Sequence, residues 1–121
     1  MQAGERLAND IAANVADAMF ALATPSRVQI LHILTAGPRT AGELTEGLGM
    51  EQSAVSHQLR ILREHGLVRV ERSGRRRMYS LADARVRVLF DAALDHVRET
   101  PLSRAPVEWK GDPPEPANER G

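Results

Sequence analysis

The stretch from residue 50 to residue 70 most constrains the fold, because a strongly two-sided helical pattern is followed there directly by a strand pattern. At helical spacing, apolar residues fall on one face, and polar and cationic residues fall on the other. Gly66 ends the helix, and Leu67-Val68-Arg69-Val70 begins an alternating strand. The apolar face holds Val55, Leu59 and Leu62; the opposite face holds Ser53, Ser56, His57, Arg60 and Arg63.

The opposite face is unusual for a helix that only meets solvent, since such a face commonly mixes Glu with Lys. Here it offers hydroxyls, an imidazole and two guanidiniums, and its only acid is Glu64 at the far end. These groups are the ones that contact base edges and phosphates. A helix with this face, followed by extended chain, has the order of a winged helix-turn-helix.

Charge is segregated along the chain even though the net charge is zero. Residues 58–80 contain seven Arg and two Glu, whereas residues 1–57 sum to −3 and residues 81–121 to −2. The concentration of cationic charge in one segment favours nucleic-acid binding. The alternative is that these Arg residues only solvate a surface, which predicts scattered Arg with acids nearby.

Three helices are predicted before the two-sided one. Residues 5–22 form an amphipathic helix, because Leu7, Ile11, Val15, Ala18 and Leu22 make one stripe. Thr24-Pro25 starts a central helix that runs through Leu34 and has apolar residues, Val28 among them, on more than one face. A capping box from Thr40 to Glu43 starts a short helix that ends at residues 47–49.

A hairpin and a last helix follow the two-sided helix, whose predicted range is residues 50–64. Strands at 67–72 and 76–81 join through a turn at Ser73-Gly74, with Arg72, Arg75, Arg76 and Arg77 at or near the tip. Such a tip suits phosphate or minor-groove contact, although charged residues also protect exposed strands from aggregation. The last helix, about residues 83–98, has an apolar stripe that we assign, with the first helix, to a dimer interface: Val86, Phe90, Ala93, Leu94 and Val97.

Length and composition limit the remaining possibilities. A chain of 121 residues is one small domain, here residues 1–99, whose core would gain from a partner subunit. Residues 100–121 are rich in Pro, Gly and charge and are expected to be a disordered tail in which Val107 and Trp109 could dock locally. There is no Cys, no apolar run near the roughly 20 residues of a membrane span, and no signal-peptide pattern, so a cytoplasmic protein is expected.

An enzyme is not expected, because the sequence has no Gly-rich phosphate loop and no grouped Ser, His and acid.

Three segments, A-T-P-S-R-V-Q-I-L-H-I-L, then S-A-V-S-H-Q-L-R-I-L-R-E-H-G-L-V, then G-R-R-R-M-Y-S-L, together resemble the ArsR/SmtB family of metal-sensing transcriptional repressors. The resemblance covers about residues 15–99. It implies a homodimeric, mainly α (α+β) winged helix-turn-helix with five helices and a two-stranded β-hairpin wing. It also implies an operator that is bound without effector and released when the effector binds.

The DNA-contacting residues are predicted from the face of the two-sided helix and the hairpin tip. A dimer would present two recognition helices to successive major grooves about 34–36 Å apart, so the operator should be an imperfect inverted repeat in double-stranded DNA. Arg60 is the candidate for contact with guanine. The full set of candidates is Gln52, Ser53, Ser56, His57, Arg60, Arg63, Arg75, Arg76 and Arg77.

The resemblance also suggests where a metal ion would bind. Sensors of the family with a Cys-containing third helix are excluded, but others carry Asp-x-His, ten residues, then His-x-x-Glu or His-x-x-His on the last helix. This chain matches with Asp83, His96 and Glu99, and has Arg85 where the family has His. Positions 85 and 96 lie about 16 Å apart along one helix, so the site would form between antiparallel helices of two subunits and suit zinc or nickel.

Arg85 leaves two alternatives open, because a guanidinium has no lone pair for a metal. Arg85 could instead pair across the interface with Glu99 or Asp83, with Asp83 also serving as an N-cap, and so lock the dimer without an ion. In that case a regulatory partner protein could supply the signal.

Overall fold

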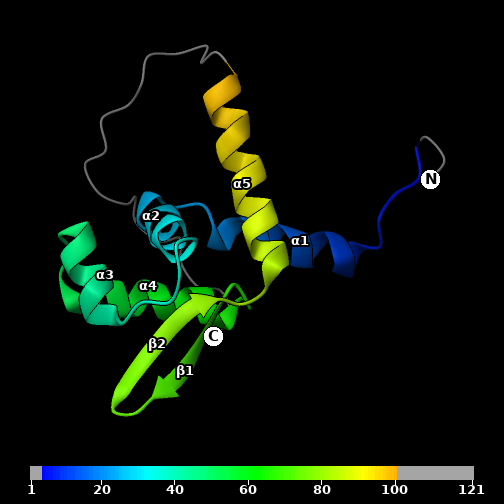
Figure 1. The fold of residues 1–121 in the computed structure, drawn as a ribbon. Helices are drawn as coiled ribbons and strands as arrows, with labels where there is room; N and C mark the ends of the chain where they lie inside the picture. The colour runs from blue at the N-terminus through cyan, green and yellow to red at the C-terminus, as the bar shows by residue number, and fades with distance from the viewer. Residues whose placement is uncertain (1–3, 101–121) are drawn as a thin grey trace.

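The computed structural model describes residues 4–100 and has five helices and one antiparallel hairpin (Figure 1). This arrangement confirms the predicted winged helix-turn-helix. The expectations for residues 101–121, including those for Val107 and Trp109, lie outside the described residues. The elements are α1 (Asn9–Ala21), α2 (Pro25–Leu34), α3 (Ala41–Leu48), α4 (Gln52–Glu64), β1 (Val68–Ser73), β2 (Arg76–Leu81) and α5 (Ala84–Glu99).

Local capping fixes where α2 and α3 begin, as the sequence predicted. The Thr24 hydroxyl accepts a hydrogen bond from the Arg27 N–H at 3.3 Å, and Pro25 occupies the first turn. At α3, the Thr40 hydroxyl accepts from the Glu43 N–H at 3.1 Å, and the Glu43 carboxylate accepts from the Thr40 N–H at 3.0 Å. Gly49, with φ of 65°, then turns the chain out of α3.

The core lies between α2, α3, α4 and the hairpin. The apolar face predicted for α4 is buried, as are Ile30 and Leu31 of α2 and Leu44 of α3. The apolar residues of α2 are not all buried, since Val28 is exposed while its neighbour Arg27 is fully buried. The Arg27 guanidinium finds hydrogen-bond acceptors in the interior.

The wing is a two-stranded hairpin tied to the start of α3. Ser73 pairs with Arg76, so the two-residue turn is Gly74-Arg75 and not the predicted Ser73-Gly74. Gly74 supplies the positive φ, 63°, that the first turn position needs. Arg39 extends the pairing on the other side of β2, since its N–H and carbonyl both bond Tyr79 at 2.9 and 2.7 Å. This third segment fixes the wing to the helix-turn-helix.

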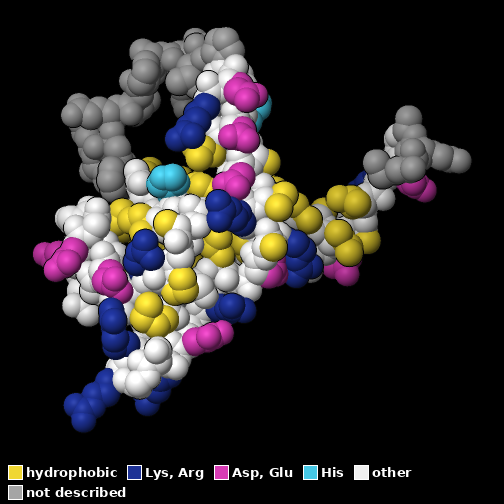
Figure 2. Space-filling view, in the orientation of Figure 1, with side chains coloured by type: hydrophobic (Ala, Val, Ile, Leu, Met, Phe, Trp, Pro, Cys, Tyr) yellow, Lys and Arg dark blue, Asp and Glu magenta, His cyan; other side chains and the backbone are white. Residues whose placement is uncertain are grey.

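Helix α1 projects from the rest of the chain (Figure 1) and starts at Asn9, later than the predicted residue 5. The N-cap residue is Ala8, which has no side-chain oxygen to hold a longer first turn. The apolar residues of its first half are exposed, with Ile11 at 51%, and Figure 2 shows the apolar side chains along this helix. Helix α4 likewise begins at Gln52, two residues after the predicted start.

The apolar stripe of α5, which was assigned to the dimer interface, is buried at the start of the helix and exposed near its end. Val86 and Phe90 are buried against the core of their own chain, so for these two residues the assignment is wrong. The connection from β2 is short, and it holds the first turns of α5 against the core. Val97, further along α5, is 57% exposed and keeps the solvent-facing position expected of an interface residue.

Candidate DNA-binding surface

The outward face of α4 carries the candidate base-contacting residues. All six predicted residues on this helix are exposed, whereas the intervening Gln58 is buried. Helices α3 and α4 are joined by the short turn at residues 49–51, which gives the helix-turn-helix arrangement. The exposed residues are Gln52, Ser53, Ser56, His57, Arg60 and Arg63.

Arg60 makes only contacts that a nucleic acid could replace at low cost. One of its guanidinium nitrogens lies 3.3 Å from Nδ1 of His57, and Nε lies 3.9 Å from the Glu64 carboxylate. Both partners of the ion pair are largely exposed, and such a pair contributes at most about 1 kcal/mol. A bidentate contact with guanine contributes about 1–3 kcal/mol of discrimination, so Arg60 can exchange partners on binding DNA.

Arginine side chains surround the tip of the wing, where dark blue groups gather in Figure 2. Arg75, Arg76 and Arg77 are all exposed. The Arg77 guanidinium lies 5.8 Å from the centroid of the Tyr79 ring, a cation–π contact within the wing. The wing therefore presents cationic groups beside α4, as the sequence predicted.

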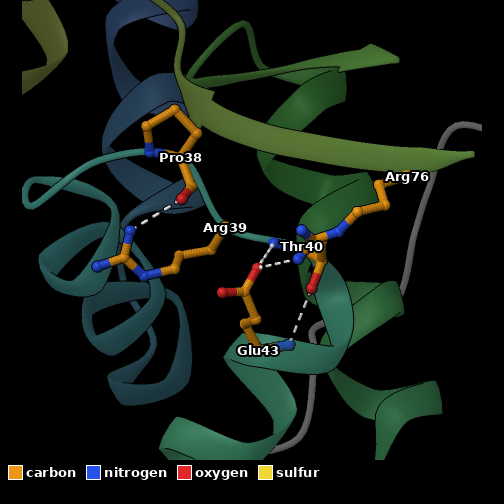
Figure 3. Close-up of polar contacts among 5 residues, drawn as sticks. All are labelled: Pro38, Arg39, Thr40, Glu43 and Arg76. Carbon is orange, nitrogen blue, oxygen red and sulfur yellow. Dashed lines mark hydrogen bonds and ion pairs between the residues drawn. The ribbon is translucent and has the colours of Figure 1, made fainter. Parts of the chain in front are cut away.

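Arg76 is not isolated, because it pairs with the first helix of the helix-turn-helix (Figure 3). Its guanidinium lies 3.1 Å from Oε1 of Glu43, the oxygen that also accepts from the Thr40 N–H. The hydrogen bonds from the Thr40 backbone and side chain, and then the charges of Arg76 and Arg39, lower the pKa of Glu43. Sequence reasoning assigned Glu43 only to the capping box and missed this contact, which joins residues 33 positions apart.

A groove between α4 and β1 adds one cation that sequence reasoning missed. Arg60, Arg63 and Arg69 line it together with Glu64, Val68 and Val70. Arg69 is exposed and donates to the Ser80 hydroxyl at 3.2 Å. Arg69 was not among the predicted DNA contacts, because only the packing of β1 against α4 places it in this groove.

The candidate metal ligands lie at opposite ends of α5. Asp83 is the N-cap, as the alternative expected, and accepts from the Arg85 N–H at 2.8 Å. The Arg85 guanidinium lies 2.9 Å from the other carboxylate oxygen of Asp83 in the same chain. The hydrogen bond from the Arg85 side chain lowers the pKa of Asp83, and the pKa of Arg85 is raised in turn.

His96 and Glu99 sit in the last turns of α5, where Nδ1 of His96 lies 3.4 Å from the Thr100 hydroxyl. Within residues 4–100 of a single chain, no three metal-ligating side chains come together. This agrees with the geometry of the helix, which separates Asp83 from His96 by more than three turns. A site made from these three residues therefore requires two subunits.

The fold and this surface define a class of protein: a winged helix-turn-helix DNA-binding regulator. A recognition helix with a polar and cationic outer face stands beside an arginine-rich wing, which is the geometry for reading a major groove and holding the flanking backbone. None of the helices in residues 4–100 is long and apolar enough to cross a membrane.

Comparison with known proteins identifies the family. The model for the bacterial regulatory protein arsR family matches residues 24–70. The chain is 53% identical over 90 residues to the HTH-type transcriptional regulator NmtR of Mycobacterium tuberculosis, covering 74% of this chain and 75% of NmtR. It is 40% identical over 96 residues to a transcriptional repressor SmtB homolog of Synechocystis, covering 79% of this chain and 73% of that protein.

A solved structure agrees with these sequence matches. A homodimeric winged helix-turn-helix DNA-binding domain from Mycobacterium bovis, a possible ArsR-family regulator, superimposes with a TM-score of 0.75 at 28% identity, covering 89% of this chain and all of that one. The chain belongs to the ArsR family. It is a DNA-binding transcriptional regulator and not an enzyme.

Proposed function

We propose that this regulator is a homodimeric repressor that binds an imperfect inverted repeat in double-stranded DNA. The observation that carries this proposal is the exposed polar and cationic face of α4 beside the arginine-rich wing. In this proposal the α4 candidates contact base edges and Arg75, Arg76 and Arg77 contact the backbone. The two recognition helices would lie about 34–36 Å apart, one helical turn of DNA.

The proposed dimer interface uses α1 and the far half of α5. Leu7, Ile11 and Val15 of the first helical stripe are exposed, as is Val97 of α5. Exposed apolar residues gathered in one stripe on a projecting helix favour an interface, because burying them removes apolar area from water. The similar domain of Mycobacterium bovis is homodimeric, which supports a dimer of this chain.

The proposal includes the domain boundary expected from the sequence, with residues 1–99 as the DNA-binding and dimerisation domain. It also places the protein in the cytoplasm, where an operator would be found. No observation on residues 4–100 favours the alternative of a regulatory partner protein.

Selection from a random-sequence DNA pool tests the proposal. The wild-type protein should enrich an inverted repeat, bind it in fluorescence anisotropy, and sediment as a dimer. A monomer in analytical ultracentrifugation, or no binding to any duplex at low ionic strength, would contradict the proposal.

We further propose that a divalent cation, zinc or nickel, regulates operator binding through Asp83 of one subunit and His96 and Glu99 of the other. The donors are nitrogen and oxygen atoms that suit these ions. The fit is incomplete, because Arg85 stands in place of a fourth ligand and pairs with the Asp83 carboxylate. Binding at three donors with Arg85 nearby should therefore be weak.

Metal titration with the matched variant Arg85→His tests this site. Isothermal calorimetry with zinc and nickel should give binding to the variant at least ten times tighter than to wild type. Metal should release a selected operator duplex from the variant at lower concentration than from wild type. Equal affinities for wild type and for a His96→Ala variant would show that these residues hold no metal.

A further inference from the structure

The buried Arg27 connects two helices that have different tasks. Its side chain is fully buried on α2. Nε donates to the Ala21 carbonyl at 2.6 Å and another guanidinium nitrogen lies 3.3 Å from the Phe20 carbonyl, both at the end of α1. A third nitrogen donates to Oε1 of Gln58 on α4 at 2.8 Å. One planar group therefore holds the end of α1 and the inner face of α4.

The contact on the α1 side holds the C-terminal end of this helix. Ala21 is the buried residue of α1, whereas most of the helix is exposed. The last carbonyls of a helix lack partners within it, and they carry the negative end of its dipole. A buried guanidinium donates hydrogen bonds to these carbonyls and places positive charge at the negative end of the dipole, so Arg27 fixes the end of α1 in position. The Arg27 guanidinium also lies 5.9 Å from the centroid of the Phe20 ring.

The contact on the α4 side lies directly behind the outward face. Gln58 is 8% exposed and sits between His57 and Arg60 in the sequence, facing inward while they face outward. Apolar contacts alone let a helix rotate slightly about its axis, since they have no direction. A hydrogen bond from a rigid guanidinium has a preferred direction, so it limits how far α4 can rotate about its axis.

We propose that Arg27 and Gln58 are positioning residues that set the orientation of the recognition helix relative to α1, and thereby fix the half-site spacing that the dimer accepts. The inference rests on the proposed dimeric binding of an inverted repeat. Because α1 lies at the proposed interface, a fixed angle between α1 and α4 also fixes α4 relative to its copy in the partner subunit.

Half-site spacing is a sensitive measure of this orientation. One inserted base pair moves a half-site by about 3.4 Å and rotates it by about 35°. A dimer with rigidly held recognition helices should tolerate neither change. A dimer whose recognition helices can turn should lose affinity for the selected duplex and discriminate less between spacings.

The experiment uses the inverted repeat enriched by wild type, and two duplexes with one central base pair added or removed. The matched variants are Gln58→Met, which keeps the side-chain length but removes the acceptor, and Gln58→Glu, which retains an acceptor. We expect wild type to bind the altered duplexes at least about tenfold more weakly, and Gln58→Met to distinguish them from the selected duplex by less than about threefold. Gln58→Glu should behave like wild type. Circular dichroism melting sets a temperature at which every variant is folded.

A second measurement needs no operator. Because the chain has no Cys, a spin label can be attached at Glu64→Cys, and the distance between the two labels of a DNA-free dimer can be measured by pulsed electron resonance. The distance distribution should broaden with Gln58→Met and not with Gln58→Glu.

Two results would overturn the inference while the proposed function stands. The first is a Gln58→Met variant that has a lower melting temperature but the same spacing penalty as wild type. The second is a distance distribution that Gln58→Met does not broaden. If no inverted repeat is enriched, the proposed function fails, and the spin-label distances then decide the inference. A monomeric protein would overturn both.

Discussion

Replacing Arg76 by Ala should make DNA binding less sensitive to salt. In the free protein Arg76 pairs with Glu43 at 3.1 Å, but both side chains are about half exposed or more, and such pairs contribute at most about 1 kcal/mol. A charge-assisted contact with phosphate contributes about 1.5–3 kcal/mol, so Arg76 should exchange Glu43 for a phosphate when DNA binds. Each phosphate that a protein neutralises adds about 0.9 to the slope of log K against log salt concentration.

A dimer has two Arg76 side chains, so the slope for Arg76→Ala should be shallower than that of wild type by about 1.8. The affinity advantage of wild type should then shrink by about tenfold between 50 and 200 mM salt. Fluorescence anisotropy with cognate and random duplexes at several salt concentrations measures the slope, and both duplexes should show the same change. Arg87→Ala is the control, because Arg87 lies on α5 and donates to the Thr35 carbonyl, away from the proposed DNA surface. An Arg76→Ala slope equal to the wild-type slope would refute phosphate contact by this residue.

Three further predictions concern base recognition, stability and pH. Arg60→Ala should cost about 1–3 kcal/mol on the selected duplex and relax its sequence preference; equal losses on selected and random DNA would refute its assigned role. Leu59→Ala, at a position that is 1% exposed, should lower the free energy of unfolding by about 2–5 kcal/mol in urea titrations, and a loss below about 1 kcal/mol would mean that the core can close the cavity. Because the pKa of Glu43 is lowered in the folded chain, its carboxylate stabilises the fold above its ordinary pKa, and this contribution is lost as pH falls through the folded pKa. The difference in unfolding free energy between wild type and Glu43→Gln should therefore be constant from pH 7 to about pH 5 and shrink below it; a difference that stays constant to pH 3 would contradict this reasoning.

Local signals were sufficient for much of the fold and for the exposed face of α4. Thr24-Pro25 and the Thr40 to Glu43 capping box act within one turn of helix, so the residues themselves determine where α2 and α3 begin. Boundaries without such a signal were less accurate, as at Ala8, where no side chain caps α1.

Contacts between distant residues could not be predicted in the same way. Glu43 and Arg76 were each assigned a separate role, yet the wing folds back so that they form an ion pair. The apolar pattern of α2 could not indicate that Arg27 is buried, because burial of a guanidinium depends on acceptors from α1 and α4. Val86 and Phe90 showed an apolar stripe, but the stripe does not say whether their own core or a partner covers it.

The sequence by itself determined the helix-turn-helix order, the inward and outward faces of α4, and the concentration of arginine in the wing, because spacing, capping and charge act over a few neighbouring residues. The tertiary structure alone decided which distant polar groups meet, namely Arg76 with Glu43, and Arg27 with the end of α1 and with Gln58. The physical reason is that hydrogen bonds and ion pairs need partners within about 3–4 Å, and only packing brings distant segments that close.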